Sequence, residues 1–101
     1  MNYSYTKSNL KQAIIILATE KKDVRNRLCC LSVIIAKLDE NDFPLELKNE
    51  WNLIVSELTC KDNRYINENY SISSIENTMR LIRNNKASKI AEKIVNLYFK
   101  L

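Results

Sequence analysis

The sequence contains no glycine and no histidine, and it has only one proline. Phosphate-binding loops need backbone that a phosphate can approach closely, so the absence of glycine excludes a P-loop and a Gly-rich dinucleotide turn. The absence of histidine excludes a Ser-His or Cys-His nucleophile pair and an imidazole metal ligand. Glycine is also preferred in tight hairpin turns, so its absence argues against a strand-rich fold. We therefore expect neither an enzyme nor a cofactor.

Length and charge place further bounds on the chain. Its 101 residues suit one domain and leave no room for a second core. The net charge is +4, but residues 1–35 and 71–101 each carry six basic and two acidic residues, whereas residues 36–70 carry four basic and eight acidic ones. An acidic middle in a mildly basic chain predicts two differently charged faces rather than a general polyanion binder.

Hydropathy and cysteine usage favour a cytoplasmic protein without a membrane span. The aliphatic run over residues 13–18 is too short to cross a membrane, and no small-residue cleavage site follows it. Cys29, Cys30 and Cys60 form an odd number, and adjacent cysteines rarely bridge, so we expect reduced thiols. Cys29 and Cys30 lie between two leucines of an expected helix, so we expect them to be buried as apolar side chains. Three cysteines do not supply the four ligands of a zinc site, and we expect no metal.

Apolar residues recur at three- and four-residue spacings. This period predicts an all-α fold, a single-domain bundle over residues 1–101 with four to five helices or a few more short ones. The expected helices are residues 8–18, 23–38, 44–58 and 74–100. Ser8, Asp23 and Ser73 are the expected N-caps, and Pro44 is the expected first residue of its helix. The expected buried stripes are Leu10, Ala13, Ile14, Leu17, Val24, Leu28, Leu31, Ile35, Leu38, Leu47, Trp51, Ile54, Leu58, Ile75, Met79, Ile82, Ile90, Ile94, Leu97 and Leu101.

Two parts of the chain carry weaker signals. Residues 59–70 are dense in Asn, Asp and Lys and have no apolar period, so we expect a connecting loop there. In the last segment, Asn84 and Asn85 are poor helix formers without being helix breakers. Residues 74–100 therefore form either one long kinked helix or two in sequence, and we favour one.

An acidic ridge is expected on the third helix. Glu46, Glu50 and Glu57 follow at steps of four and seven, so they share one helix face with Leu53. This face is either an ordinary solvated surface or a docking surface for a cationic protein. In the second case charge speeds encounter and Leu53 supplies buried apolar area. The candidate partner-binding residues are Asp39, Glu40, Asp42, Glu46, Glu50, Leu53 and Glu57.

A lysine strip is expected near the C-terminus, formed by Lys86, Lys89, Lys93 and Lys100. Basic clusters on one helix face attract phosphate backbones. Lysines near a helix C-terminus are also favoured by the helix dipole, and the strip lacks the aromatic residues of many nucleic-acid sites. The candidate nucleic-acid contacts are Arg80, Arg83, Lys86, Lys89 and Lys93.

Several short motifs resemble a known group of proteins. They are Asp23-Val24-Arg25, Arg27-Leu28, Asp42-Phe43-Pro44, Leu58-Thr59 and Lys89-Ile90-Ala91-Glu92-Lys93-Ile94. Together they resemble small bacterial proteins encoded in genomic islands, some of which look like immunity proteins of contact-dependent growth-inhibition systems. In those systems a small cytoplasmic inhibitor is paired with each toxin. The resemblance covers most of the chain after residue 10, and its motifs are largely structural, so it implies a helical fold and no particular site residues.

We therefore expect a cytoplasmic immunity protein that binds a cognate toxin, a nuclease domain, and occludes its active site through the acidic ridge. Its carboxylates would pair with the lysines and arginines that a nuclease uses to hold RNA or DNA. The alternative is a small nucleic-acid-binding or regulatory protein that uses the lysine strip. A third interpretation is a non-catalytic assembly subunit. We expect no membrane partner.

Overall fold

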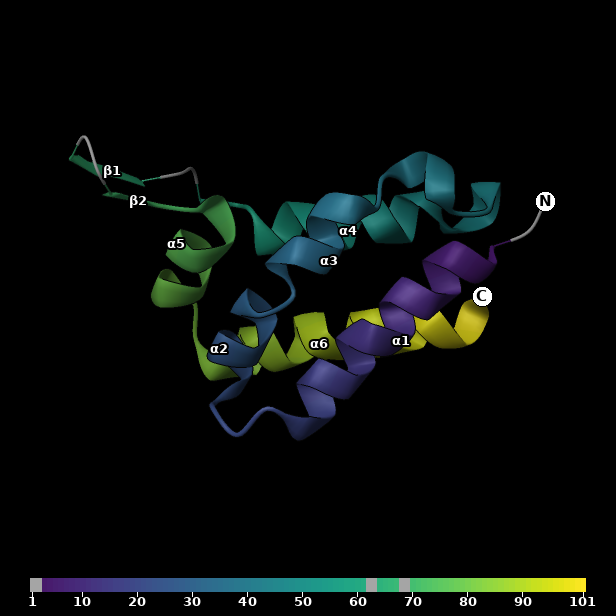
Figure 1. The fold of residues 1–101 in the computed structure, drawn as a ribbon, viewed down its shortest axis with the longest axis horizontal. Coiled ribbons are helices and arrows are strands. Elements are labelled where there is room, and N and C mark those ends of the chain that lie inside the picture. Colours follow the sequence, from purple (N-terminus) through teal and green to yellow (C-terminus); the bar gives the residue numbers. More distant parts are fainter. Residues whose placement is uncertain (1–2, 62–63, 68–69) are drawn as a thin grey trace.

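Helices pack around one apolar core in the computed structural model, which describes residues 3–61, 64–67 and 70–101 (Figure 1). The α-helices are α1 (Ser4–Thr19), α2 (Val24–Cys29), α3 (Ser32–Lys37), α4 (Lys48–Leu58), α5 (Ser74–Leu81) and α6 (Asn84–Lys100). Two 3₁₀ turns, η1 (Glu40–Asp42) and η2 (Leu45–Leu47), precede α4. Because Cys30 and Leu31 keep right-handed helical backbone angles, α2 and α3 form one bent segment, and the described residues form five helices. The all-α prediction is confirmed.

The core is built from the apolar stripes that the sequence predicted. Helix α6 packs against α1, α2 and α4, and its residues Ile90, Ile94 and Leu97 are completely buried. Burying one such side chain contributes about 1.5–3 kcal/mol to stability. Ile14, Leu17, Val24 and Leu101 are half-buried, and the other predicted stripe residues are buried. The period of the sequence therefore identified the inward faces.

Two of the predicted caps are present. The Asp23 carboxylate accepts the N–H of Asn26 at 3.0 Å and begins α2, and this hydrogen bond, with the nearby Arg25 guanidinium, lowers the pKa of Asp23. The hydroxyl of Ser73 accepts the N–H of Glu76 at 3.2 Å and begins α5. Such side chains satisfy backbone donors that have no partner within the helix.

Two other predicted helix starts are wrong by a few residues. Helix α1 begins at Ser4, so Ser8 lies inside it rather than at its N-cap. Pro44 lies at the N-cap of η2, and the α-helix begins only at Lys48, because a 3₁₀ turn comes first. Phe43 is extended, as expected for a residue that precedes proline.

Residues 74–100 form two helices in sequence, so the second predicted alternative is confirmed and the favoured single helix is wrong. Ile82 and Arg83 have extended backbone (ψ 160° and 158°), which separates α5 from α6. The carbonyl of Ile82 accepts a hydrogen bond from Arg25 Nη1 at 3.4 Å, and its side chain is buried in the core. A contact with α2 therefore stabilises a break that local helix propensity does not encode.

Residues 59–70 were predicted as a loop that connects α4 to α5, and their described residues contribute to strands, while residues 62–63 and 68–69 lie outside the described part of the chain. Strand β1 (Arg64–Asn67) pairs antiparallel with β2 (Tyr70–Ile72), with a register irregularity between Tyr65 and Asn67. This two-stranded hairpin extends away from the helices (Figure 1). The absence of glycine disfavoured a hairpin, and the prediction of a plain loop was wrong for the described residues of this segment.

Trp51 is the largest fully buried side chain, and its ring stacks on Phe43 with centroids 4.7 Å apart. We expect Trp51→Ala to lower the free energy of unfolding by about 3–5 kcal/mol, because it leaves a cavity and removes the stack. The matched control is Leu53→Ala on the same helix, where the side chain is 52% exposed and the expected loss is about 0.5 kcal/mol. Urea unfolding followed by circular dichroism measures both, and equal losses would contradict this account of the core.

Candidate functional site

The acidic ridge and the lysine strip meet along the line where α4 packs against α6. Lys93 Nζ donates to the carboxylate of Glu57, and Lys100 Nζ donates to Glu50 Oε1 at 2.7 Å. Helices α4 and α6 run antiparallel, so the earlier lysine of the two, Lys93, pairs with the later glutamate, Glu57. The acidic ridge and the lysine strip were predicted as alternative binding sites, but along this contact their charges neutralise each other. We call this line of contact the α4–α6 seam.

A small hollow lies within the seam. It has a volume of about 230 Å³ and is lined by Glu50, Leu53, Ile54, Lys93, Asn96 and Lys100. Leu53 is half-exposed at this hollow, whereas Ile54 belongs to the core. The seam thus offers an apolar side chain between two ion pairs rather than a row of free carboxylates.

A group of carboxylates lies before α4, in the acidic corner formed by Asp39, Glu40, Asp42 and Glu46. The Asp42 carboxylate accepts the N–H of Asp39 at 2.9 Å, and Glu40 accepts the side-chain amide of Asn52 at 2.7 Å. Both donors are uncharged groups, so these hydrogen bonds bring no positive charge beside the carboxylates. None of the four forms an ion pair with another described residue. Beside them Leu45 is 81% exposed.

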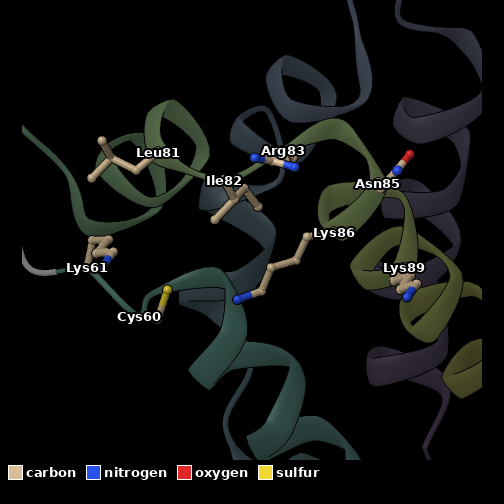
Figure 2. Close-up of a pocket in the computed structure, with 8 residues that line it drawn as sticks. All are labelled: Cys60, Lys61, Leu81, Ile82, Arg83, Asn85, Lys86 and Lys89. Carbon is tan, nitrogen blue, oxygen red and sulfur yellow. The ribbon is translucent and has the colours of Figure 1, made fainter.

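A second and larger hollow, of about 660 Å³, lies where the end of α4 meets the α5–α6 junction (Figure 2). Among the described residues, the cations that line it are Lys61, Arg83, Lys86 and Lys89, and no described carboxylate lines it. The other lining residues are Cys60, Leu81, Ile82 and Asn85. The side chain of Lys86 extends towards Cys60 in Figure 2. We call this hollow the basic pocket.

The predicted nucleic-acid contacts are thereby divided. Arg83, Lys86 and Lys89 line the basic pocket, whereas Lys93 is held by Glu57 in the seam. Arg80 is exposed on α5, where its Nη1 donates to Asn77 Oδ1 at 3.4 Å. The strip is therefore not one continuous basic surface, because its C-terminal half is already paired.

Two features of these sites were not predicted from the sequence. One is the contribution of Cys60 and Lys61 to the basic pocket, and the other is the ion pairing between α4 and α6 at the seam. Lys61 and Cys60 follow α4, and only the fold brings them beside α6. The seam did leave a signal in the sequence. Glu50 and Glu57 are seven residues apart, as are Lys93 and Lys100, and equal spacings suit a pair of antiparallel helices.

The three thiols are free, but their burial differs from the prediction. Only Cys29 is half-buried; burial, and then the charge of Glu76, raise the pKa of its thiol and keep it protonated. Cys30 is exposed because Leu28 and Leu31 take the inward positions at the α2–α3 bend. Cys60 is exposed at the basic pocket.

No family model, curated protein or solved structure matches this chain. The resemblance to immunity proteins therefore stays a prediction. Across residues 3–61, 64–67 and 70–101, no helix is long and apolar enough to cross a membrane. In the same part of the chain, no three cysteine or carboxylate side chains lie together as potential metal ligands.

The two seam ion pairs should contribute unequally to stability. The Glu57 side chain is 20% exposed and that of Glu50 is 39% exposed, so water screens the pair of Glu50 and Lys100 more strongly. Double-mutant cycles to alanine, followed by urea unfolding, should give about 0.2–1 kcal/mol of coupling for Lys100 and Glu50. The coupling between Lys93 and Glu57 should be larger. A larger coupling for the exposed pair, or none for either, would contradict the described seam.

Proposed function

We propose that this chain is a non-catalytic, cytoplasmic inhibitor of the immunity-protein type. Its partner is a cationic toxin domain, a nuclease, which it binds through the acidic corner and the neighbouring Leu53. The resemblance of its motifs to immunity proteins supports this class of function. Such a protein needs no cofactor and no catalytic group of its own.

One observation carries the proposal: free negative charge and exposed apolar area occur together before and along α4. The four carboxylates of the acidic corner have no cationic partner among the described residues. Leu45, in η2 between the residues of the corner, is 81% exposed, and Leu53, on α4, is 52% exposed. Charged groups around an apolar anchor are typical of protein interfaces.

The inhibition would act by occlusion. A nuclease holds its substrate with lysines and arginines, and the acidic corner offers carboxylates to the same groups. Complementary charge speeds encounter, and burial of Leu53 slows dissociation. Glu50 and Glu57 contribute less than the ridge pattern predicted, because Lys100 and Lys93 already neutralise them.

The net charge of +4 is compatible with this role. The acidic corner lies before α4 and the basic pocket at the α5–α6 junction, towards opposite ends of a molecule 44 Å long (Figure 1). The Debye length at physiological salt is about 8 Å, so the partner at one end hardly senses the charge at the other.

The test uses cells that express the toxin domain that this proposal expects to be encoded beside the gene for this chain. We expect the wild-type chain to protect their growth and Glu46→Lys with Leu53→Asp to lose protection, because like charges then face each other and an unpaired charge enters the interface. Thermal melts of the variant should change little, since both side chains are exposed.

The matched control is Glu92→Lys, which reverses an exposed carboxylate on α6 outside the acidic corner. This control should protect as well as the wild-type chain. Full protection by the folded double variant would show that the contact surface lies elsewhere. Absence of protection by the wild-type chain would reject the inhibitor proposal itself.

A second candidate function is nucleic-acid binding, and the basic pocket is the observation that favours it. Arg83, Lys86 and Lys89 of the predicted contact set line that pocket, and none of its described lining residues is a carboxylate. The pocket also brings in Lys61, so its cations come from separate segments of the chain.

For this candidate the informative variant is Lys86→Glu with Lys89→Glu, because Lys93 is paired and its replacement would also disturb the seam. We expect wild-type affinity for duplex DNA or RNA to be only non-specific, about 10⁻⁴–10⁻⁶ M, and to fall steeply with salt. Fluorescence anisotropy measures both, with Lys11→Glu and Lys22→Glu as the control of equal charge. Sub-micromolar, sequence-selective binding would rank this function above inhibition.

A further inference from the structure

The basic pocket differs from the rest of α6 in how its cations are balanced. Further along the helix, Lys93 and Lys100 each have a glutamate partner on α4. At the pocket, four cations line one hollow, and no carboxylate of the described residues does. Like charges gathered in this way repel each other, and the described lining residues supply no opposite charge. A bound anion would relieve this repulsion.

The first turn of α6 adds to the same field. Arg83 is its N-cap residue and makes no side-chain cap hydrogen bond, and Asn85 and Lys86 of the first turn line the pocket. The N-terminus of a 17-residue helix carries partial positive charge and backbone N–H groups without partners in the helix. The helix end and the side chains therefore favour anions at the same place.

We infer that the basic pocket binds a compact ligand with two or more adjacent phosphate groups. A phosphate monoester carries about −1.5 to −2 charges at neutral pH, so two such groups match the four cations. Arg83 can donate a fork of hydrogen bonds to phosphate oxygens, and the three lysines act as point charges.

The lining of the pocket suits a compact anion. Lys61, which follows α4, joins Arg83, Lys86 and Lys89 at the start of α6 around one hollow of about 660 Å³, so cations from two segments of the chain can contact the same ligand (Figure 2). Leu81 and Ile82 form an apolar part of its wall, and the amide of Asn85 adds hydrogen-bonding groups.

The inference does not depend on the inhibitor proposal. The acidic corner and the basic pocket share no residue and lie towards opposite ends of the molecule. Failure of phosphate binding would therefore leave protection against a toxin unaffected, and the reverse also holds.

The test is isothermal titration calorimetry with inorganic tripolyphosphate as the probe. Replacing two phosphate-binding lysines by Lys86→Gln and Lys89→Gln should weaken binding by about tenfold or more, because hydrogen bonds to charged groups are lost. The matched control is Lys11→Gln with Lys22→Gln, which removes the same charge from exposed positions outside the pocket and should have little effect. Equal weakening by both pairs would show non-specific attraction and overturn the inference.

A second measurement locates the ligand within the wild-type chain. Cys60 lines the pocket and Cys30 does not, although both thiols are exposed. Tripolyphosphate should slow the alkylation of Cys60 by iodoacetamide and leave that of Cys30 unchanged, as measured by peptide mass spectrometry. Unchanged Cys60 alkylation at a saturating probe concentration would overturn the inference. So would a single-stranded or duplex oligonucleotide that binds more tightly than tripolyphosphate at equal phosphate concentration.

Discussion

The buried face of α6 is the constraint on which the other features depend. Ile90, Ile94 and Leu97 are fully buried against α1, α2 and α4, so the helix cannot rotate without exposing them. This fixed rotation decides where each lysine of the helix lies. Lys93 and Lys100 face α4, and Lys86 and Lys89 face the hollow at the α5–α6 junction. The core therefore sets the charge pattern of the surface.

That division shows why charge counts along a sequence mislead about binding surfaces. The acidic ridge and the lysine strip each have the composition of a docking site when they are considered alone. In the fold, ion pairs with α6 occupy Glu50 and Glu57, whereas the carboxylates of the acidic corner before α4 form no ion pair with another described residue. A charged side chain offers long-range attraction to a partner only where its own fold leaves it unpaired.

The sequence predicts those parts of the fold that local rules control. The buried stripes, the caps at Asp23 and Ser73 and the extended Phe43 follow from helical period and backbone sterics. The break at Ile82 does not, because it depends on a hydrogen bond from Arg25, which lies 57 residues away. The basic pocket is equally non-local, since Lys61 reaches it only after α4 has packed. Candidate sites on one helix were thus partly predictable, and those shared between segments were not.

A chain without glycine or histidine can still carry two chemically opposite surfaces, because neither surface needs catalytic groups or close backbone approach. The acidic corner combines charge with exposed leucines, which suits a protein partner. The basic pocket combines charge with concavity, which suits a small anion. Screening over about 8 Å keeps the two fields independent along a 44 Å axis. The net charge of +4 is then a sum over two separate environments and describes neither of them.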